Sequence, residues 1–139
     1  MKTIRALSIS LLLMSGVAAI VGGGSMLIDP SGGSIGLPIA MLSTTPFADY
    51  FIPGLILFVA VGVLNVVTGL LSILRNAHSA QLTILQGAIL TGWIAIQSLL
   101  LQTTNLIQLA VGALGFTLFC LGLFQADEER VVNDNNYLD

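Results

Sequence analysis

The stretch that decides the fold is DPSGGSIGLPIAMLSTTPFADYFIPG, residues 29–54. It contains all four prolines of the chain and two of its seven acidic residues, Asp29 and Asp49, within a sequence that is otherwise mostly apolar. Because Pro, Gly and Asp favour turns over continuous helix, this stretch separates one apolar segment before it from three after it. The sequence therefore predicts four hydrophobic helices with one long connection.

The composition of the 139-residue chain does not suit a water-soluble domain. Hydrophobic residues make up 55% of the chain and charged residues only 8%, whereas soluble domains carry about 25% charged residues. The mean hydropathy of +0.98 agrees with this. The four basic residues are scattered and form no patch for nucleic acid. We expect a single domain whose surroundings are the lipid bilayer.

Four segments approach or exceed the roughly 20 residues that a helix needs to cross a bilayer. They are predicted at residues 6–28, 50–74, 82–101 and 106–124. Together they predict an all-α transmembrane four-helix bundle within a membrane domain of residues 1–125. The acidic remainder, residues 126–139, is predicted to be a cytoplasmic tail too polar to order itself, with a short helical continuation through residues 128–132 as the alternative.

The first segment has a second interpretation as a secretory signal peptide. Lys2 and Arg5 precede its apolar run, and Val17-Ala18-Ala19 is a weak match to a cleavage site. The run is longer than the roughly 7–15 apolar residues of a signal peptide, which favours a retained span. Cleavage would leave three spans.

The basic residues predict the orientation. With the N-terminus in the cytoplasm, Lys2, Arg5, Arg75 and Arg130 all fall on the cytoplasmic side. The two outer connections, residues 29–49 and 102–105, then contain no Lys or Arg. This distribution follows the positive-inside rule, so we expect both termini in the cytoplasm.

The outer connection contains an apolar segment of its own, IGLPIAML at residues 35–42. It is too short to span a bilayer, and it predicts an interfacial or re-entrant segment with Pro38 in its first turn. Docking of its apolar side chains would contribute about 25 cal/mol per Å² of buried apolar area. We therefore expect this segment to cap the bundle, and a site, if one exists, to lie beneath it.

The residues around this segment have predicted local roles. Thr45 is expected to cap the second span, with Pro46 at its first helical position and Asp49 near its positive end. Pro53 is expected to kink that helix or restart it. Asp29 fits a turn at the start of the connection. The candidate cap residues are Asp29, Pro38, Asp49 and Pro53.

Polar residues inside the spans predict which helix faces meet. Asn65 lies in the second span near Gly62 and Gly69, and it is expected to face another helix. In the third span Gln86, Trp93 and Gln97 follow helical spacing and share one face. The favoured interpretation is hydrogen bonding between helices around one packed ring. The functional alternative is the lining of a ligand site or narrow pore.

The sequence lacks the groups that membrane enzymes and proton-coupled transporters use. None of its charged residues lies inside a predicted span, and its single histidine, His78, falls in a polar link. Cys120 is the only cysteine. No catalytic set, cofactor or metal site is therefore expected.

Two non-enzymatic functions are compatible with these residues. The first is an accessory subunit of a larger membrane complex, or a homo-oligomer. The alternative is a channel or carrier for a neutral or apolar solute, lined by Asn65, Gln86, Trp93 and Gln97.

The outer connection also carries a resemblance to a known group. Its motifs are Asp29-Pro30, GLP at residues 36–38, TPFADY at 45–50 and IPG at 52–54, joined by Gly92-Trp93-Ile94 and Gln97 in the third span. In these the chain resembles a group of small, uncharacterised bacterial integral membrane proteins with four helices. The resemblance implies the fold and a multi-pass location in the inner membrane. It implies no activity and no site residue.

Overall fold

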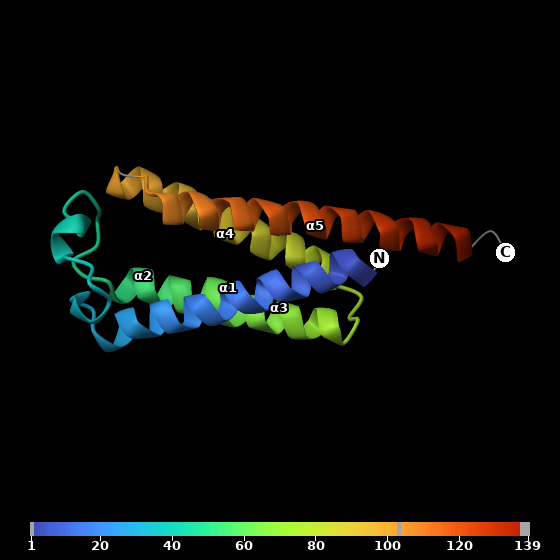
Figure 1. Cartoon of the computed structure of the whole chain (residues 1–139), viewed down its shortest axis with the longest axis horizontal. Helices are drawn as coiled ribbons and strands as arrows, with labels where there is room; N and C mark the ends of the chain where they lie inside the picture. The colour runs from blue at the N-terminus through green and yellow to red at the C-terminus, as the bar shows by residue number, and fades with distance from the viewer. Residues whose placement is uncertain (1, 103, 137–139) are drawn as a thin grey trace.

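The computed structural model describes residues 2–102 and 104–136, and every regular element in that part of the chain is helical (Figure 1). In chain order the elements are α1 (Lys2–Ile28), the 3₁₀ turns η1 (Gly33–Ile35) and η2 (Ile39–Leu42), α2 (Phe51–Ile56), the π-helical η3 (Leu57–Val63), α3 (Leu64–Ile73), α4 (Ser79–Leu101) and α5 (Leu106–Asn136). α2, η3 and α3 follow one another without a break and form one long helix.

Four helices in the described residues are long and apolar enough to cross a membrane. They are Lys2–Ile28, Phe51–Ile73, Ser79–Leu101 and Leu106–Val132. The all-helical class and the number of spans confirm the sequence prediction. The short connection after α4, with Gln102 in the left-handed region at φ 51°, turns the chain back into α5 as an antiparallel hairpin.

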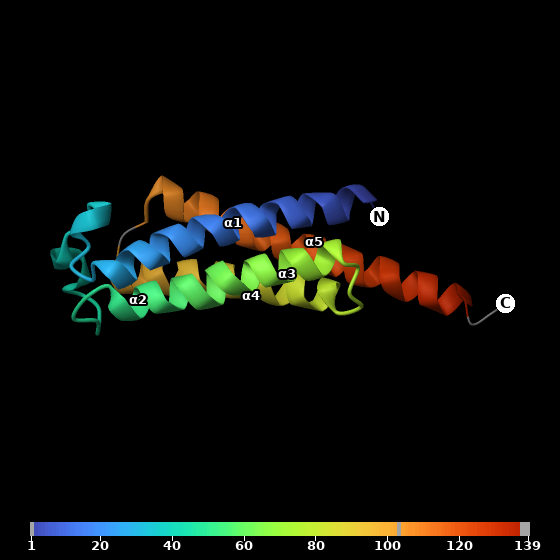
Figure 2. The same ribbon diagram turned by 90° about the horizontal axis from the view of Figure 1, so that it is seen from below.

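The helices form two layers, and the helices within each layer run antiparallel (Figures 1 and 2). In the first layer α1 packs along α2, η3 and α3, and in the second α4 packs along α5. Both chain ends lie at one end of the bundle, which we call the termini end. The connection of residues 29–50, which we call the cap segment, lies at the opposite end, the cap end.

Glycines bring the backbones within each layer close together. A Cβ atom added at Gly23 of α1 would lie 2.6 Å from the nitrogen of Phe58 and 2.8 Å from the carbonyl oxygen of Gly54. In the second layer a Cβ at Gly87 would collide with the Phe119 backbone and lie 2.8 Å from the carbonyl oxygen of Gly115. Such contacts are typical of membrane helices, where small residues allow tight van der Waals packing.

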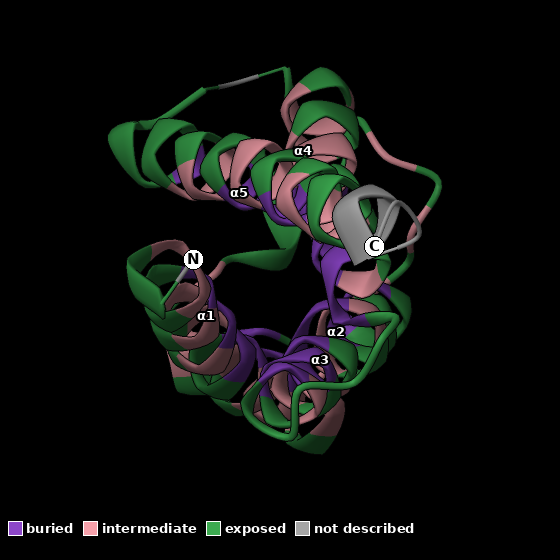
Figure 3. Ribbon diagram, turned by 90° about the vertical axis from the view of Figure 1, so that its right-hand side faces the viewer, coloured by how far each residue is buried: buried purple, intermediate pink, exposed green. Residues whose placement is uncertain are grey.

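The two layers converge at the termini end. There the Arg5 guanidinium lies 3.3 Å from the Glu129 carboxylate, and the Gln125 amide donates a hydrogen bond of 2.6 Å to the Ser8 hydroxyl. The ion pair is partly exposed, and such pairs contribute about 0–1 kcal/mol. Figure 3 looks along the bundle from this end and shows buried positions on the faces where helices meet.

The prediction of a disordered tail from residue 126 is wrong for the described residues. α5 continues to Asn136 and extends beyond the other helices (Figure 1). The contact of Glu129 with Arg5 holds this extension against α1, and the sequence from Ala126 to Arg130 consists mostly of good helix formers. Residues 137–139 of the predicted tail lie outside the described part.

The prediction that Thr45 caps the second span is also wrong. The helix begins at Phe51, and Thr45 instead accepts a hydrogen bond from the Phe47 N–H at 3.3 Å within a turn. The Asp49 carboxylate accepts the Phe51 N–H at 2.9 Å, so the acid does serve the helix start. Pro53 lies in the first turn, where an N–H has no partner inside the helix, so it causes no break.

Candidate functional site

The cap segment is ordered by hydrogen bonds around Tyr50. The Tyr50 N–H donates to the carbonyl oxygen of Pro30 at 2.9 Å, and its hydroxyl donates to that of Pro38 at 3.1 Å. Only 5% of Tyr50 is exposed, and this burial raises the pKa of its hydroxyl. A tyrosine hydroxyl is protonated at neutral pH even without this shift, so it is available as a donor.

Asp29 fixes the start of the cap segment. Its carboxylate accepts hydrogen bonds from the hydroxyl and the N–H of Ser31 and from the N–H of Ser34. The Ser31 hydroxyl, followed by the Ser34 N–H, lowers the pKa of Asp29. This is the turn role that the sequence predicted, and it explains the carboxylate without a ligand.

The apolar part of the cap segment docks only in part. Leu42 is buried, and Leu37 is half-buried. Ile39 and Met41 stay substantially exposed. The segment is therefore ordered by its hydrogen bonds as well as by burial of its apolar side chains.

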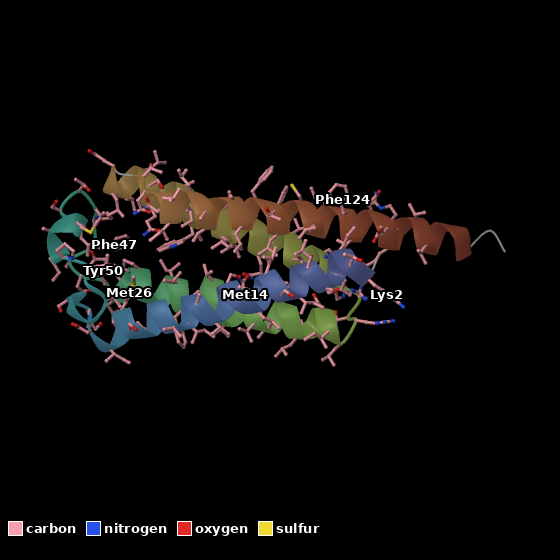
Figure 4. The ribbon with its side chains drawn as sticks, in the orientation of Figure 1. Lys2, Met14, Met26, Phe47, Tyr50 and Phe124 are labelled. Carbon is pink, nitrogen blue, oxygen red and sulfur yellow. The ribbon has the colours of Figure 1, made fainter. Side chains whose placement is uncertain are left out.

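A cavity of about 880 Å³ lies beneath the cap segment, between the two layers. Its walls come from α1, the cap segment, α2, η3, α4 and α5. Figure 4 shows Met26, Phe47 and Tyr50 near one another at the cap end, with Met14 farther along α1 and Lys2 at the opposite end. The sequence predicted that any site would lie beneath this segment.

The lining of the cavity is mostly aliphatic and aromatic. Its polar members are uncharged: Ser15, Thr45, Gln97, Asn105 and Gln108, together with the polar tips of Tyr50 and Trp93. None of the described residues that line the cavity carries a charge. Its size lies within the roughly 300–1,000 Å³ of sites for drug-sized ligands, which are also mostly apolar with a few polar groups.

The four predicted interior residues divide between the cavity and the packed bundle below it. Trp93 and Gln97 line the cavity, whereas Asn65 and Gln86 do not. Asn65 is fully buried, and its amide donates to the Ser15 hydroxyl at 2.9 Å across the contact with α1. Gln86 is 2% exposed. A single pore lined by all four is therefore absent from this arrangement.

The half of the bundle toward the termini end has an unusually polar interior. Its buried polar residues are Ser8, Asn65, Thr68, Ser72, Ser79, Thr83, Gln86 and Gln125. Within the described residues, five of their buried atoms have no hydrogen-bond partner: Asn65 Oδ1, Ser72 Oγ, Ser79 Oγ, Gln86 Oε1 and Gln125 Oε1. Unpaired buried polar atoms are costly in hydrocarbon surroundings. The interior of this half is therefore not made of apolar contacts alone, and its five unpaired atoms reduce its stability.

Sequence reasoning missed two polar residues at the mouth of the cavity, Asn105 and Gln108. The side-chain Oε1 of Gln108 accepts the backbone N–H of Asn105 at 3.0 Å, and the side-chain Oδ1 of Asn105 accepts the backbone N–H of Gln108 at 2.9 Å. This reciprocal pair is a capping box at the start of α5. The spacing Asn-x-x-Gln before an apolar run was the signal that would have found it.

A second, smaller pocket of about 200 Å³ lies at the termini end. It is lined by Lys2, Arg5, Arg75, Gln125, Glu128 and Glu129. Basic and acidic side chains are mixed in it, and Arg5 already pairs with Glu129. The pocket therefore presents no clear preference for a ligand of either charge.

Comparison with known proteins adds no relative to these observations. The chain matches no family model, no curated protein sequence and no solved structure. The resemblance of the cap segment to small bacterial membrane proteins therefore stays a prediction. Function has to be inferred from the cavity and from the polar residues around it.

Proposed function

We propose that this chain is a non-enzymatic membrane protein that binds an apolar solute in the cavity beneath the cap segment. The observation that carries the proposal is the cavity itself, about 880 Å³ with an uncharged and mostly apolar lining. A subunit with a purely structural role has no need of a space of this size between its layers. A solute-binding protein needs to keep it.

The lining supports an apolar solute over an ion or a metabolite with charged groups. Transferring an ion into such surroundings is strongly unfavourable unless a partner of opposite charge is present, and the described lining offers none. An apolar molecule that enters from the lipid loses no hydrogen bonds, and it gains van der Waals contact with the lining. Gln97 and Trp93 supply the few polar groups that orient a bound molecule.

We also propose the orientation with both termini in the cytoplasm of a bacterial cell and the cap segment outside its inner membrane. The positive-inside rule supports it, because Lys2, Arg5 and Arg75 gather at the termini end. The cap segment contains Asp29 and Asp49 but no Lys or Arg. The position of residues 35–42 at the outer surface follows from this orientation.

The orientation predicts opposite labelling of two introduced cysteines. In a Cys120→Ala background, Ser31→Cys in the cap segment should react with a membrane-impermeant maleimide on intact cells. Ala77→Cys, in the exposed link between α3 and α4, should react only after the cells are permeabilised. Labelling of Ala77→Cys on intact cells would show that the orientation is reversed.

Solute binding can be measured through Trp93, the only tryptophan in the chain. Bromine atoms quench tryptophan fluorescence on contact, so a dibrominated alkane in lipid nanodiscs reports on whatever surrounds the ring. We expect saturable quenching at low mole fraction, because the cavity holds a limited amount of alkane. Quenching that rises only in proportion to the alkane concentration would mean contact from bulk lipid and would refute the proposal.

Two neighbouring residues of α1 provide a blocked variant and its control. Ala18 lines the cavity, whereas Val17 is exposed and does not. Ala18→Phe should remove the saturable component, and Val17→Phe should leave it unchanged. If the protein is instead an accessory subunit or a homo-oligomer, neither variant changes quenching, and the mass of the particle purified in mild detergent exceeds that of one chain.

A further inference from the structure

The cavity extends over a depth that matches one leaflet of a bilayer. Along α1 its lining runs from Met14 to Met26, a rise of twelve residues, and along α4 from Leu90 to Leu101, a rise of eleven residues. At about 1.5 Å per residue these lengths are about 16–18 Å. Half of the roughly 30 Å hydrocarbon core is about 15 Å. An extended chain of leaflet length therefore fits along it.

The cavity is also open at its sides. Met14 of α1 and Ile107 of α5 line it, although 70% and 75% of their surfaces are exposed. Ile96 of α4, in the same layer as Ile107, also lines it and is 54% exposed. These side chains line the cavity and are also exposed on the outside of the protein. In a membrane the cavity is therefore open to the lipid acyl chains at these positions. A solute reaches it from the bilayer without crossing the cap segment.

Uncharged polar groups gather where this space meets the cap end. The side-chain amide of Gln97 lines the cavity and has no hydrogen-bond partner among the described residues. Gln108 is 6% exposed, and its capping bond uses the carbonyl oxygen, which leaves its NH₂ group free to donate. Thr45 and Asn105 border the same space. These groups suit the hydroxyl or ester oxygens of a polar head.

The charge distribution at the cap end favours one class of ligand head group over another. The cap segment carries the acids Asp29 and Asp49, and the basic side chains of the described residues lie toward the termini end. An anionic head at the cap end meets like charge and no cation, which is unfavourable. An uncharged head meets neither difficulty.

We infer that the cavity binds a single-chain amphiphile with an uncharged head, such as a monoacylglycerol, taken from the outer leaflet. The acyl chain lies between the layers from the level of Ser15 toward Met26, and the head contacts Gln97 and Gln108. This inference rests on the proposed function and on the proposed orientation. It goes further by naming the ligand class and the direction from which the ligand arrives.

The experiment compares two brominated amphiphiles in nanodiscs, again through Trp93. One is a monoacylglycerol and the other a lysophosphatidylglycerol with the same brominated chain, which is anionic at pH 7. We expect saturable quenching by both, with half-saturation by the monoacylglycerol at a mole fraction lower by on the order of tenfold. Gln97→Leu should raise the half-saturating mole fraction of the monoacylglycerol by about threefold, the loss expected for one hydrogen bond in a membrane.

The outcomes separate this inference from the proposal beneath it. If the dibrominated alkane binds saturably but the anionic lysolipid binds as well as the monoacylglycerol, the ligand class is wrong and apolar binding stands. The same holds if Gln97→Leu leaves monoacylglycerol binding unchanged, since the head then lies elsewhere. If the alkane itself shows no saturable quenching, both ideas fail together.

Discussion

Gly87→Ala is expected to destabilise the protein by about 1–3 kcal/mol, the usual cost of overpacking a filled interior. The added methyl group would meet the backbone of Phe119 and the carbonyl oxygen of Gly115. Backbone atoms cannot swing aside as the end of a side chain can, so α4 and α5 have to separate along their contact. Thermal unfolding of the purified protein in mild detergent should show a lower midpoint temperature.

Gly92 of the same helix supplies the matched control. A Cβ atom there meets nothing within 4 Å, so Gly92→Ala adds a methyl group without a collision. Alanine is favoured over glycine inside a helix by about 0.5–1 kcal/mol, and the midpoint should stay the same or rise. Equal destabilisation by both variants would mean that the close contact at Gly87 does not exist in the membrane protein.

Gly23→Ala is expected to have a comparable effect on the first layer. Its methyl group would lie 2.6 Å from the nitrogen of Phe58 and 2.8 Å from the carbonyl oxygen of Gly54, again against backbone. α1 has to move away from α2 at the cap end, where the N–H of Tyr50 donates to the carbonyl oxygen of Pro30. We therefore expect a lower unfolding temperature and faster amide exchange at Tyr50.

The adjacent Gly24 is the control for this variant. Its added Cβ would lie 3.7 Å from the ring of Phe58, which is ordinary van der Waals contact. Gly24→Ala should leave both the unfolding temperature and the exchange rate of the Tyr50 amide nearly unchanged. Slow exchange at Tyr50 in Gly23→Ala, despite a lower unfolding temperature, would show that the cap segment does not depend on the position of α1.

Much of the fold could be predicted because hydropathy and length determine where a membrane helix can be. The four spans and the antiparallel pairing of α4 with α5 follow from those quantities alone. The end of α5 could not, since its acidic composition argues for disorder, while the helical extension is held by Glu129 against a residue 124 positions away. A contact between the two ends of a chain leaves no local pattern.

The position of the cavity that forms the candidate site could be predicted from the sequence, but its shape could not. The apolar run at residues 35–42 and the prolines around it indicated a cap, and the spacing of Trp93 and Gln97 indicated an inward face. The size of the cavity depends on the distance between the two layers, and the sequence of a single helix does not determine that distance. Tyr50 illustrates the same limit, because its bonds to Pro30 and Pro38 exist only once the cap segment has folded back.

The fastening of the two layers has a mechanical consequence. At the termini end they are joined by Ser8 with Gln125 and by Arg5 with Glu129, and at the cap end the Thr44 hydroxyl donates to the carbonyl oxygen of Leu100 at 2.7 Å. The two layers are therefore held most firmly near Ser8 and Gln125, and they can separate more easily at the cap end. We therefore expect a molecule that enters between the layers to separate them most at the cap end and to break the contact of Thr44 with Leu100 first.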